Sequence, residues 1–153
     1  MSAPNLVIHK AVNSDVRDLV KLESASFVSS DGLLTERAFR YHIKRGNLCL
    51  IAREEISGEI AGYVLVLPHR KSARVYSLAT SARHQGKGVA RSLLHKAIEE
   101  VRQRNIPLLK LEVRRENTPA IALYQSLGFH IQRIRQNYYG TNEDAICMQI
   151  AFI

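Results

Sequence analysis

Apolar and polar residues alternate along the chain in patterns that predict a regular succession of strands and helices. Alternation at every second position predicts a strand over residues 6–12. Apolar residues at helical spacing follow it and predict a helix that begins at Asn13 or Ser14. A second helix is predicted from Thr35, a capping residue, to Gly46, a residue type that commonly ends helices. We therefore expect the chain to begin with a strand and two helices.

Three strand patterns come next, and they are typical of an antiparallel meander. They cover residues 48–53, 60–67 and 74–80. The first two are joined by a turn around Gly58, and Pro68 ends the second because proline cannot donate to a strand ladder. These features predict a hairpin that is followed by a third strand.

The second half of the chain alternates between helices and strands. Its predicted elements are a helix over residues 89–104, a strand over 108–114, a helix that opens at Thr118, and strands over 129–139 and 145–152. Pro119 at the first position of the second helix and Gly128 after its last turn mark the two ends of that helix. A short turn at residues 140–142 is expected between the last two strands.

The order of the predicted elements is β-α-α-β-β-β-α-β-α-β-β, which is typical of a mixed α/β fold. Because a helix separates the strands at residues 74–80 and 108–114, these two strands are expected to be parallel, whereas the sheet is otherwise expected to be mostly antiparallel. A chain of 153 residues of which 46% are apolar can bury a full core. We therefore predict one domain over residues 1–153.

The apolar runs and the two cysteines bear on where the protein is located. The longest apolar run, residues 60–67, is far too short to span a bilayer, and the first ten residues contain no apolar run of signal-peptide length. We therefore expect a cytoplasmic protein without a membrane partner. Cys49 and Cys147 stand in apolar runs without CxxC spacing, which favours buried, reduced thiols.

Candidate chemistry centres on the loop before the helix at residues 89–104, where Gly86 and Gly88 stand two apart. The first turn of a helix has unpaired backbone N–H groups and a partial positive charge, so it binds phosphate well. Glycine lets a ligand approach these amides and permits a positive φ. The 22 Lys and Arg residues exceed the 14 Asp and Glu residues, and the resulting net charge of +8 favours anionic partners such as a phosphorylated cofactor, nucleic acid or a ribosome surface.

Two common glycine-rich phosphate sites fit this loop poorly. A dinucleotide-binding pattern needs a third glycine at the position of Arg91. A P-loop needs Ser or Thr after Gly86 and Lys87, but Gly88 stands there. A plain glycine turn before a core helix is the structural alternative.

A different signature fits the loop better. Gln85-x-x-Gly88-x-Ala90 resembles the acetyl-CoA signature of the GCN5-related N-acetyltransferases (GNAT). Two downstream segments, LEVRRENTPAIALYQSLGF at residues 111–129 and RIRQNYYGTNEDAICM at residues 133–148, resemble the ribosomal-protein-alanine N-acetyltransferases of the RimI type. The resemblance implies a GNAT fold whose parallel strand pair splays apart. It also implies an enzyme that transfers acetyl directly from acetyl-CoA to a primary amine.

The resemblance assigns one set of residues to acetyl-CoA. In the family, the main chain of the strand before the loop holds the pantetheine arm and the acetyl carbonyl, and the loop amides hold the diphosphate. Lys87 and Arg91 would add positive charge, and Asn117 would bond the cofactor while it also caps a helix. The implied cofactor-binding residues are Leu78, Ala79, Thr80, Gln85, Gly86, Lys87, Gly88, Val89, Ala90, Arg91 and Asn117.

Two further residues are implied to be catalytic, because acetyl transfer needs a deprotonated amine and a proton for the leaving thiolate. From spacing alone, Glu112 is interpreted as an exposed, salt-bridged carboxylate of a strand, and Tyr124 as a core tyrosine of a helix. In RimI-like enzymes the matching Glu is the general base, acting directly or through water, and the matching Tyr protonates the thiolate. The resemblance therefore implies these roles for Glu112 and Tyr124.

The acceptor is less well defined by the sequence. Tyr138 and Tyr139 are implied to contact it, together with the segment from Phe27 to Leu34, and strand packing is the alternative for the two tyrosines. We predict that the acceptor is a protein N-terminal α-amine, because an α-amine of pKa about 7.7–8.0 loses its proton more easily than lysine does. A ribosomal protein is the candidate partner that the resemblance suggests.

Other functions stay open at this point. One alternative is a lysine or small-molecule amine acetyltransferase on the same fold, and another is a basic RNA- or ribosome-binding module. Aromatic and basic residues are not interleaved as in RNA-binding sheets, so no specific nucleic acid is predicted. The six histidines lack the spacing of metal ligands, and no metal is predicted.

Overall fold

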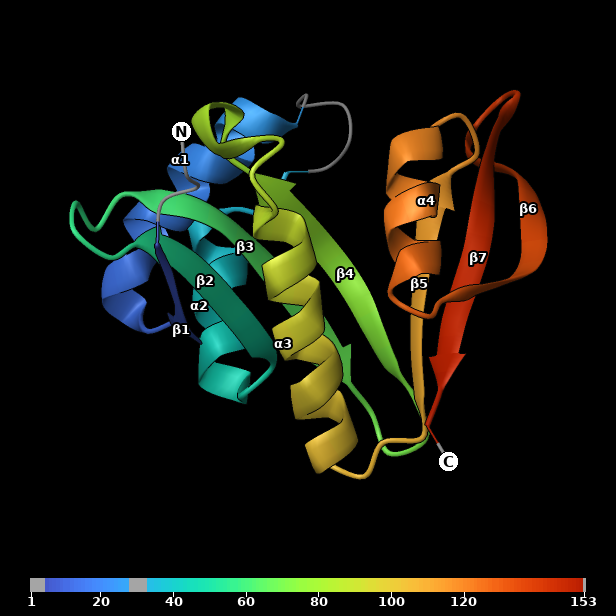
Figure 1. The fold of residues 1–153 in the computed structure, drawn as a ribbon, viewed down its shortest axis with the longest axis horizontal. Coiled ribbons are helices and arrows are strands. Elements are labelled where there is room, and N and C mark those ends of the chain that lie inside the picture. Colours follow the sequence, from blue (N-terminus) through green and yellow to red (C-terminus); the bar gives the residue numbers. More distant parts are fainter. Residues whose placement is uncertain (1–4, 28–32, 153) are drawn as a thin grey trace. The chain divides into compact units, whose positions relative to one another are not determined.

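The computed structural model describes residues 5–27 and 33–152, and its elements follow the predicted order (Figure 1). These elements are β1 (Leu6–Lys10), the 3-10 turn η1 (Asn13–Asp15), α1 (Val16–Ser26), α2 (Glu36–Arg45), β2 (Leu48–Glu54), β3 (Ile60–Pro68), β4 (Ala73–Thr80), the 3-10 turn η3 (Ala82–His84), α3 (Val89–Gln103), β5 (Leu108–Arg114), α4 (Thr118–Ser126), β6 (His130–Gly140) and β7 (Glu143–Ala151). The order β-α-α-β-β-β-α-β-α-β-β is confirmed. The two 3-10 turns were not predicted.

The strands form a mixed sheet in the order β1-β2-β3-β4-β5-β7-β6. The pairs β1 with β2, β2 with β3, β5 with β7 and β6 with β7 are antiparallel. β4 and β5 are parallel, and their register joins Ala73 to Leu109 and Arg74 to Lys110. The predicted mostly antiparallel sheet with one parallel pair is therefore confirmed.

The chain divides into two compact units. The first comprises residues 1–67 and 76–97, and the second comprises residues 68–75 and 98–153. The glycine loop belongs to the first unit, whereas Glu112 and Tyr124 belong to the second. One domain over residues 1–153 stays a prediction.

The core of the first unit lies between β2 and β3 and the helices α1 and α2. Leu19 of α1 and Phe39 of α2 have no exposed surface, and Phe39 meets the Tyr63 ring of β3 edge-on at 5.5 Å. The ends of α2 agree with the prediction, because Ala38 N donates to the capping Thr35 Oγ1 at 3.1 Å and Gly46 has a left-handed φ of 80°.

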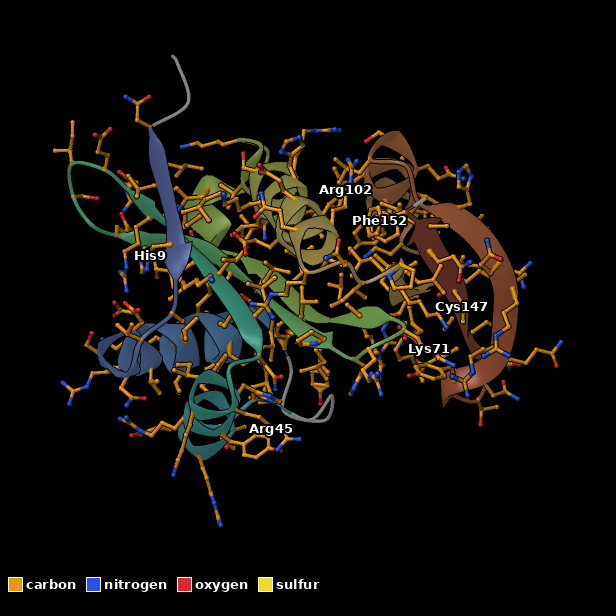
Figure 2. All side chains as sticks on the ribbon, turned by 90° about the horizontal axis from the view of Figure 1, so that it is seen from below. His9, Arg45, Lys71, Arg102, Cys147 and Phe152 are labelled. Carbon is orange, nitrogen blue, oxygen red and sulfur yellow. The ribbon has the colours of Figure 1, made fainter. Side chains whose placement is uncertain are left out.

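The second unit is built on the alternation along β5. Leu109, Leu111 and Val113 are buried on one face, so Glu112 points to the other. In this unit the Arg102 guanidinium of α3 also lies 5.8 Å from the ring of Phe152 (Figure 2).

The two cysteines are free thiols, as expected. Cys49 is buried, and burial raises the pKa of its thiol to about 12. Cys147 is half-buried rather than fully buried. Among the described residues, no helix combines the length and the apolar character that crossing a membrane would require.

Candidate active site

The predicted phosphate-binding loop is a turn that leads directly into α3. Gly86 has a φ of 78° and Gly88 a φ of 79°, so both residues occupy the left-handed region that glycine adopts without strain. A Cβ built on either glycine meets no heavy atom within 4 Å. The backbone conformation therefore demands glycine at these positions, and open space lies beside both residues.

The residues around the two glycines divide into exposed and anchoring positions. Gln85, Lys87 and Arg91 are exposed, whereas Val89 is 1% exposed and fixes the start of α3. Ala90 is half-buried. The exposed cations add positive charge next to the N-terminus of α3, where the helix dipole already favours an anion.

Gly62 of β3 explains how α3 comes so close to the strands, and the sequence reasoning missed it. A Cβ on Gly62 would lie 2.7 Å from the Ala79 carbonyl oxygen and 2.9 Å from Val89 Cγ1. Any side chain at position 62 would therefore push the beginning of the helix away from β4. Its neighbour Tyr63 faces α1 and α2, so the start of α3 and these two helices lie on opposite faces of β3.

The three residues predicted to act through their main chain form the end of β4. Ala79 is buried, while Leu78 and Thr80 are half-buried. Directly after them, Ser81 N donates to the carbonyl of Ala61 at 2.8 Å, which ties the end of the strand to β3. A role of this main chain toward a cofactor stays a prediction.

Glu112 forms the centre of a cluster of charged and aromatic side chains in the second unit. Arg74 Nε donates to Glu112 Oε2 at 2.9 Å, and Arg74 Nη2 donates to the Tyr138 hydroxyl at 3.0 Å. The Glu112 side chain is 18% exposed. Glu112 is therefore salt-bridged, as expected, but its partner Arg74 is not one that the spacing along the strand indicates, and the carboxylate is much less exposed than expected. We call Arg74, Glu112, Tyr138 and Tyr139 the Arg74 cluster.

The two tyrosines of this cluster are held by each other and by arginines. Their rings meet edge-on with centroids 4.9 Å apart. The Arg135 guanidinium lies 4.7 Å from the Tyr138 ring, and that of Arg114 lies 4.4 Å from the Tyr139 ring. Burial, followed by the neighbouring Tyr138, raises the pKa of Tyr139 to about 12. The predicted acceptor contacts Tyr138 and Tyr139 thus lie beside the predicted base.

An interruption in β6 coincides with these tyrosines. The pairing of β6 with β7 shifts register between Arg135 and Gly140, and Asn137 has a left-handed φ of 56°. Asn137 N donates to Asp144 Oδ1 at 2.9 Å, and Asn142 N donates to Asn137 Oδ1 at 2.8 Å. The sequence pattern predicted an uninterrupted strand here.

Tyr124 lies on α4, where it is half-buried. Its ring meets that of Phe129 edge-on at 5.8 Å, and burial raises the pKa of its hydroxyl. The phenol therefore stays protonated at neutral pH and can donate a proton. Asn117 caps this helix as predicted, because its Oδ1 accepts from Ala120 N at 3.3 Å. The helix begins at Thr118, as predicted, and Pro119 lies in its first turn.

The predicted acceptor segment lies only partly within the described residues. Phe27 is half-buried and packs against the core of the first unit, and Leu34 is buried. Leu34 N donates to the buried Glu23 Oε2 at 2.8 Å, which anchors the end of this segment on α1. Residues 28–32 of this segment lie outside the described residues.

Known proteins of one family match this chain. A profile described as "Acetyltransferase (GNAT) family" matches residues 16–129. The [ribosomal protein bS18]-alanine N-acetyltransferase of Escherichia coli is 39% identical over 97 residues, which is 61% of this chain and 66% of that enzyme. The chain thus spans about two thirds of the length of this relative. The enzyme of the same name from Haemophilus ducreyi is 30% identical over 94% of this chain and 99% of its own length.

Solved structures agree with these matches. The crystal structure of the ribosomal-protein-S18-alanine N-acetyltransferase from Escherichia coli has a TM-score of 0.85 and 29% identity, and the match covers 96% of this chain and 94% of that one. The structure of yncA from Salmonella typhimurium, solved with its cofactor acetyl-CoA, has a TM-score of 0.80 at 23% identity over 96% of this chain and 94% of that one, which shows the shared fold. The predicted fold and the resemblance to RimI-type enzymes are confirmed.

Proposed function

The chain belongs to the acetyltransferase (GNAT) family, and we propose that it is an N-acetyltransferase that transfers acetyl from acetyl-CoA to the N-terminal α-amine of a protein. The observation that carries the proposal is the loop at Gly86 and Gly88, where two left-handed glycines with open space beside them precede the start of α3. Such a loop suits the diphosphate of coenzyme A. We also propose that residues 1–153 form one functional domain. The proposed location of the protein is the cytoplasm.

Most of the residues proposed to bind the coenzyme belong to the first unit. The amides from Gly86 to Arg91 hold the diphosphate, and the Lys87 and Arg91 side chains strengthen this binding in a salt-dependent way. The main chain of Leu78, Ala79 and Thr80 holds the pantetheine arm. Acetyl-CoA supplies the acetyl group as a thioester, and no metal takes part in the proposed reaction.

Glu112 is proposed as the general base. An ammonium has no electron pair to attack a carbonyl, so Glu112 accepts a proton from the acceptor amine, directly or through a water. Arg74 binds one carboxylate oxygen and the Tyr138 hydroxyl, and it thereby fixes the orientation of the base. Tyr138, Tyr139 and Phe27 contact the acceptor, and Asn117 contacts the cofactor.

Tyr124 is proposed as the general acid. The neutral amine forms a C–N bond to the acetyl carbonyl carbon, and the tetrahedral intermediate collapses by breaking the C–S bond. Tyr124 donates a proton to the departing thiolate, because burial keeps its hydroxyl protonated. An ammonium acceptor loses two protons in all. The first goes to Glu112 before the attack and passes on to solvent, and the second leaves the nitrogen of the intermediate and balances the proton that the thiolate takes up from Tyr124. No acyl-enzyme forms in this scheme.

The acceptor is proposed by analogy with the relatives, whose names identify alanine of ribosomal protein bS18 as the acetylated residue. A ribosomal protein that begins with a small residue is therefore the proposed partner. An α-amine with a pKa of about 7.7–8.0 needs less help from a base than lysine does.

A panel of acceptors tests the proposal. Thioester consumption is measured with peptides that have a free α-amine, with lysine peptides whose N-terminus is blocked, and with polyamines. The free α-amine peptides are expected to react fastest, and the same peptides with an acetylated N-terminus serve as the matched control. Equal rates with all acceptors, or preference for lysine or polyamines, would refute the α-amine proposal.

A further inference from the structure

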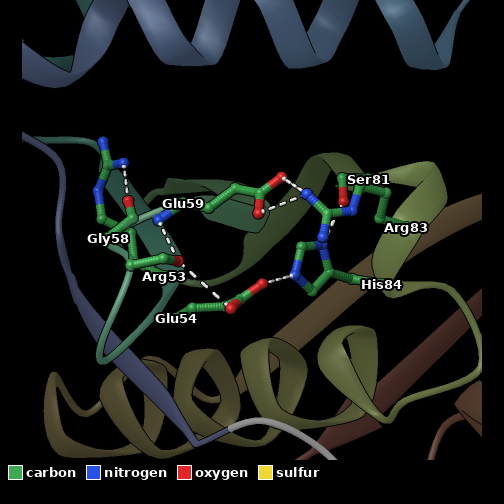
Figure 3. A network of polar contacts seen from close by, with 8 residues as sticks. Arg53, Glu54, Gly58, Glu59, Ser81, Arg83 and His84 are labelled. Carbon is green, nitrogen blue, oxygen red and sulfur yellow. Dashed lines mark hydrogen bonds and ion pairs between the residues drawn. The ribbon is translucent and has the colours of Figure 1, made fainter.

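A network of polar side chains links the phosphate-binding loop to the hairpin of β2 and β3 (Figure 3). At its centre is His84 of η3, which is 1% exposed. Its Nδ1 lies 2.5 Å from Ser81 Oγ, and its Nε2 lies 2.5 Å from Glu54 Oε2 at the end of β2. His84 therefore ties the turn before the loop to a strand 30 positions earlier in the sequence.

The two partners of the imidazole determine which ring nitrogen donates a hydrogen bond and which accepts one. An ionised carboxylate only accepts hydrogen bonds, so Nε2 carries the hydrogen that points to Glu54. When the ring is neutral, Nδ1 accepts from the Ser81 hydroxyl. When the ring is protonated, Nδ1 donates to the same oxygen, because a hydroxyl can turn to accept. Both contacts are thus available to either form of the ring.

The position of His84 in the chain lets this contact fix the start of the glycine loop. His84 directly precedes Gln85, the first residue of the loop, and the loop then bends through two left-handed glycines. Glycines give a loop many alternative conformations. The loop amides can therefore point at a ligand together only if the entry of the loop is held in one conformation. At the exit, buried Val89 anchors α3. At the entry, the buried contact is that of His84.

We propose that His84 is a positioning residue whose hydrogen bond to Glu54 fixes the entry of the phosphate-binding loop and thereby sets the affinity for coenzyme A. This inference rests on the proposed coenzyme site. It concerns a residue outside the signature of the loop and a partner on β2, neither of which would touch the coenzyme.

A second contact joins the same two segments and provides a natural control. Arg83 Nη1 donates to both carboxylate oxygens of Glu59 at 2.9 Å. The Arg83 side chain is 76% exposed and that of Glu59 is 37% exposed, in contrast to 2% for His84. Water screens an exposed ion pair, so this contact is expected to contribute little to the loop.

The same side chains offer another interpretation, which the experiment must separate. Ligand atoms of Glu54, Glu59 and His84 lie within 4.8 Å of one another, close enough to suggest a metal site. However, the Arg83 guanidinium already supplies the positive charge next to Glu59. A metal ion would have to displace it, so we favour the hydrogen-bonded arrangement.

Two replacements of His84 test the contact with Glu54 separately from the contact with Ser81. In His84→Gln, the side-chain amide can reach the position of Nε2 and donate to Glu54. In His84→Asn, the shorter side chain can reach only the position of Nδ1. Coenzyme A binding is measured by calorimetry for each variant, together with kcat, KM for acetyl-CoA and the melting temperature.

The proposal predicts a divergence between these two variants. His84→Asn should raise the Kd for coenzyme A about tenfold, the size expected for one charge-assisted hydrogen bond, while kcat at saturating acetyl-CoA changes less than twofold. His84→Gln should keep the Kd within about twofold to threefold of the wild type. Glu54→Ala should raise the Kd for coenzyme A as much as His84→Asn does. The Kd of the double variant should be no higher than that of either single variant, because both changes remove the same bond.

Glu59→Gln is the control, and it should change the Kd less than about twofold. Equal Kd values for His84→Asn and His84→Gln would overturn the proposal. So would a rise in melting temperature when Zn²⁺ is added to the wild type but not to Glu59→Gln, which would make the cluster a metal site. If the wild type itself fails to bind coenzyme A, the proposed function fails. If the wild type and His84→Asn bind equally well, only the role of His84 fails.

Discussion

Arg74 is the residue whose replacement tests the architecture of the second unit most fully. It bonds Glu112 and Tyr138 at once, and no feature of the sequence singles it out. The change Arg74→Met removes both bonds but keeps a long apolar stem. Arg74→Lys is the matched control, because it keeps the charge but cannot bond both partners in the planar geometry of a guanidinium.

The loss of stability expected for Arg74→Met depends on how far the Arg74 side chain is exposed to water. A buried charge-assisted hydrogen bond contributes about 1.5–3 kcal/mol. Because 43% of the Arg74 side chain is exposed, screening reduces the Glu112 bond to about 1 kcal/mol. The bond to the neutral Tyr138 hydroxyl adds about 0.5–1 kcal/mol. Arg74→Met should therefore lower the free energy of unfolding by about 1.5–2 kcal/mol, or the melting temperature by about 3–8 °C.

The expected loss of activity is larger than the loss of stability alone would cause. Without Arg74, the Glu112 carboxylate is no longer held in one orientation, and kcat/KM for the acceptor peptide should fall about 10- to 100-fold. The kcat/KM of Arg74→Lys should lie between the values for Arg74→Met and the wild type. The Kd for coenzyme A should not change, since the loop belongs to the other unit. An unchanged kcat/KM together with a lower melting temperature would show that the Arg74 cluster is structural only.

Three further predictions concern single residues. Glu112→Gln and Tyr124→Phe should each lower kcat about 10²- to 10⁴-fold without changing the Kd for coenzyme A, and steady-state kinetics with unchanged rates in both would refute their roles. The hydrogen bond from His84 lowers the pKa of Glu54, so the carboxylate stabilises the fold above its ordinary pKa of 4.5 and this contribution disappears as pH falls through the lowered value. Urea unfolding between pH 3 and 7 should therefore show a steeper acid loss for the wild type than for Glu54→Gln, and parallel curves would contradict this. Thr35→Ala should cost about 1 kcal/mol by removing the cap of α2, whereas the exposed Arg37→Ala should cost much less in the same denaturation assay.

Local signals explain why so much of the fold was predictable. The strand at Leu108–Arg114 was predicted with its observed ends because strict alternation leaves only one face to bury. Thr35 and Gly46 marked the ends of α2 because capping chemistry is encoded within a few residues. The left-handed glycines of the loop were predictable for the same reason.

The contacts that sequence reasoning missed are those made between distant residues. Arg74 and Glu112 are 38 positions apart, and Glu54 and His84 are 30 positions apart. Neither pair has a spacing that a helix or strand would reveal, because the sheet brings them together only after folding. Gly62 was missed for a related reason, since its need for glycine comes from the close approach of Val89 and Ala79.

The binding of coenzyme A to variants of Gly88 tests the central claim most directly. Gly88→Asp adds a side chain and a negative charge to a left-handed position at the start of α3, whereas Gly46→Asp adds the same group to a position with a nearly identical φ of 80° and equally open surroundings at the end of α2. The account predicts by calorimetry that Gly88→Asp weakens coenzyme A binding at least about tenfold, because like charges then meet at the diphosphate, and that Gly46→Asp leaves the Kd unchanged. Equal Kd values for Gly88→Asp and the wild type would show that these amides do not hold the diphosphate.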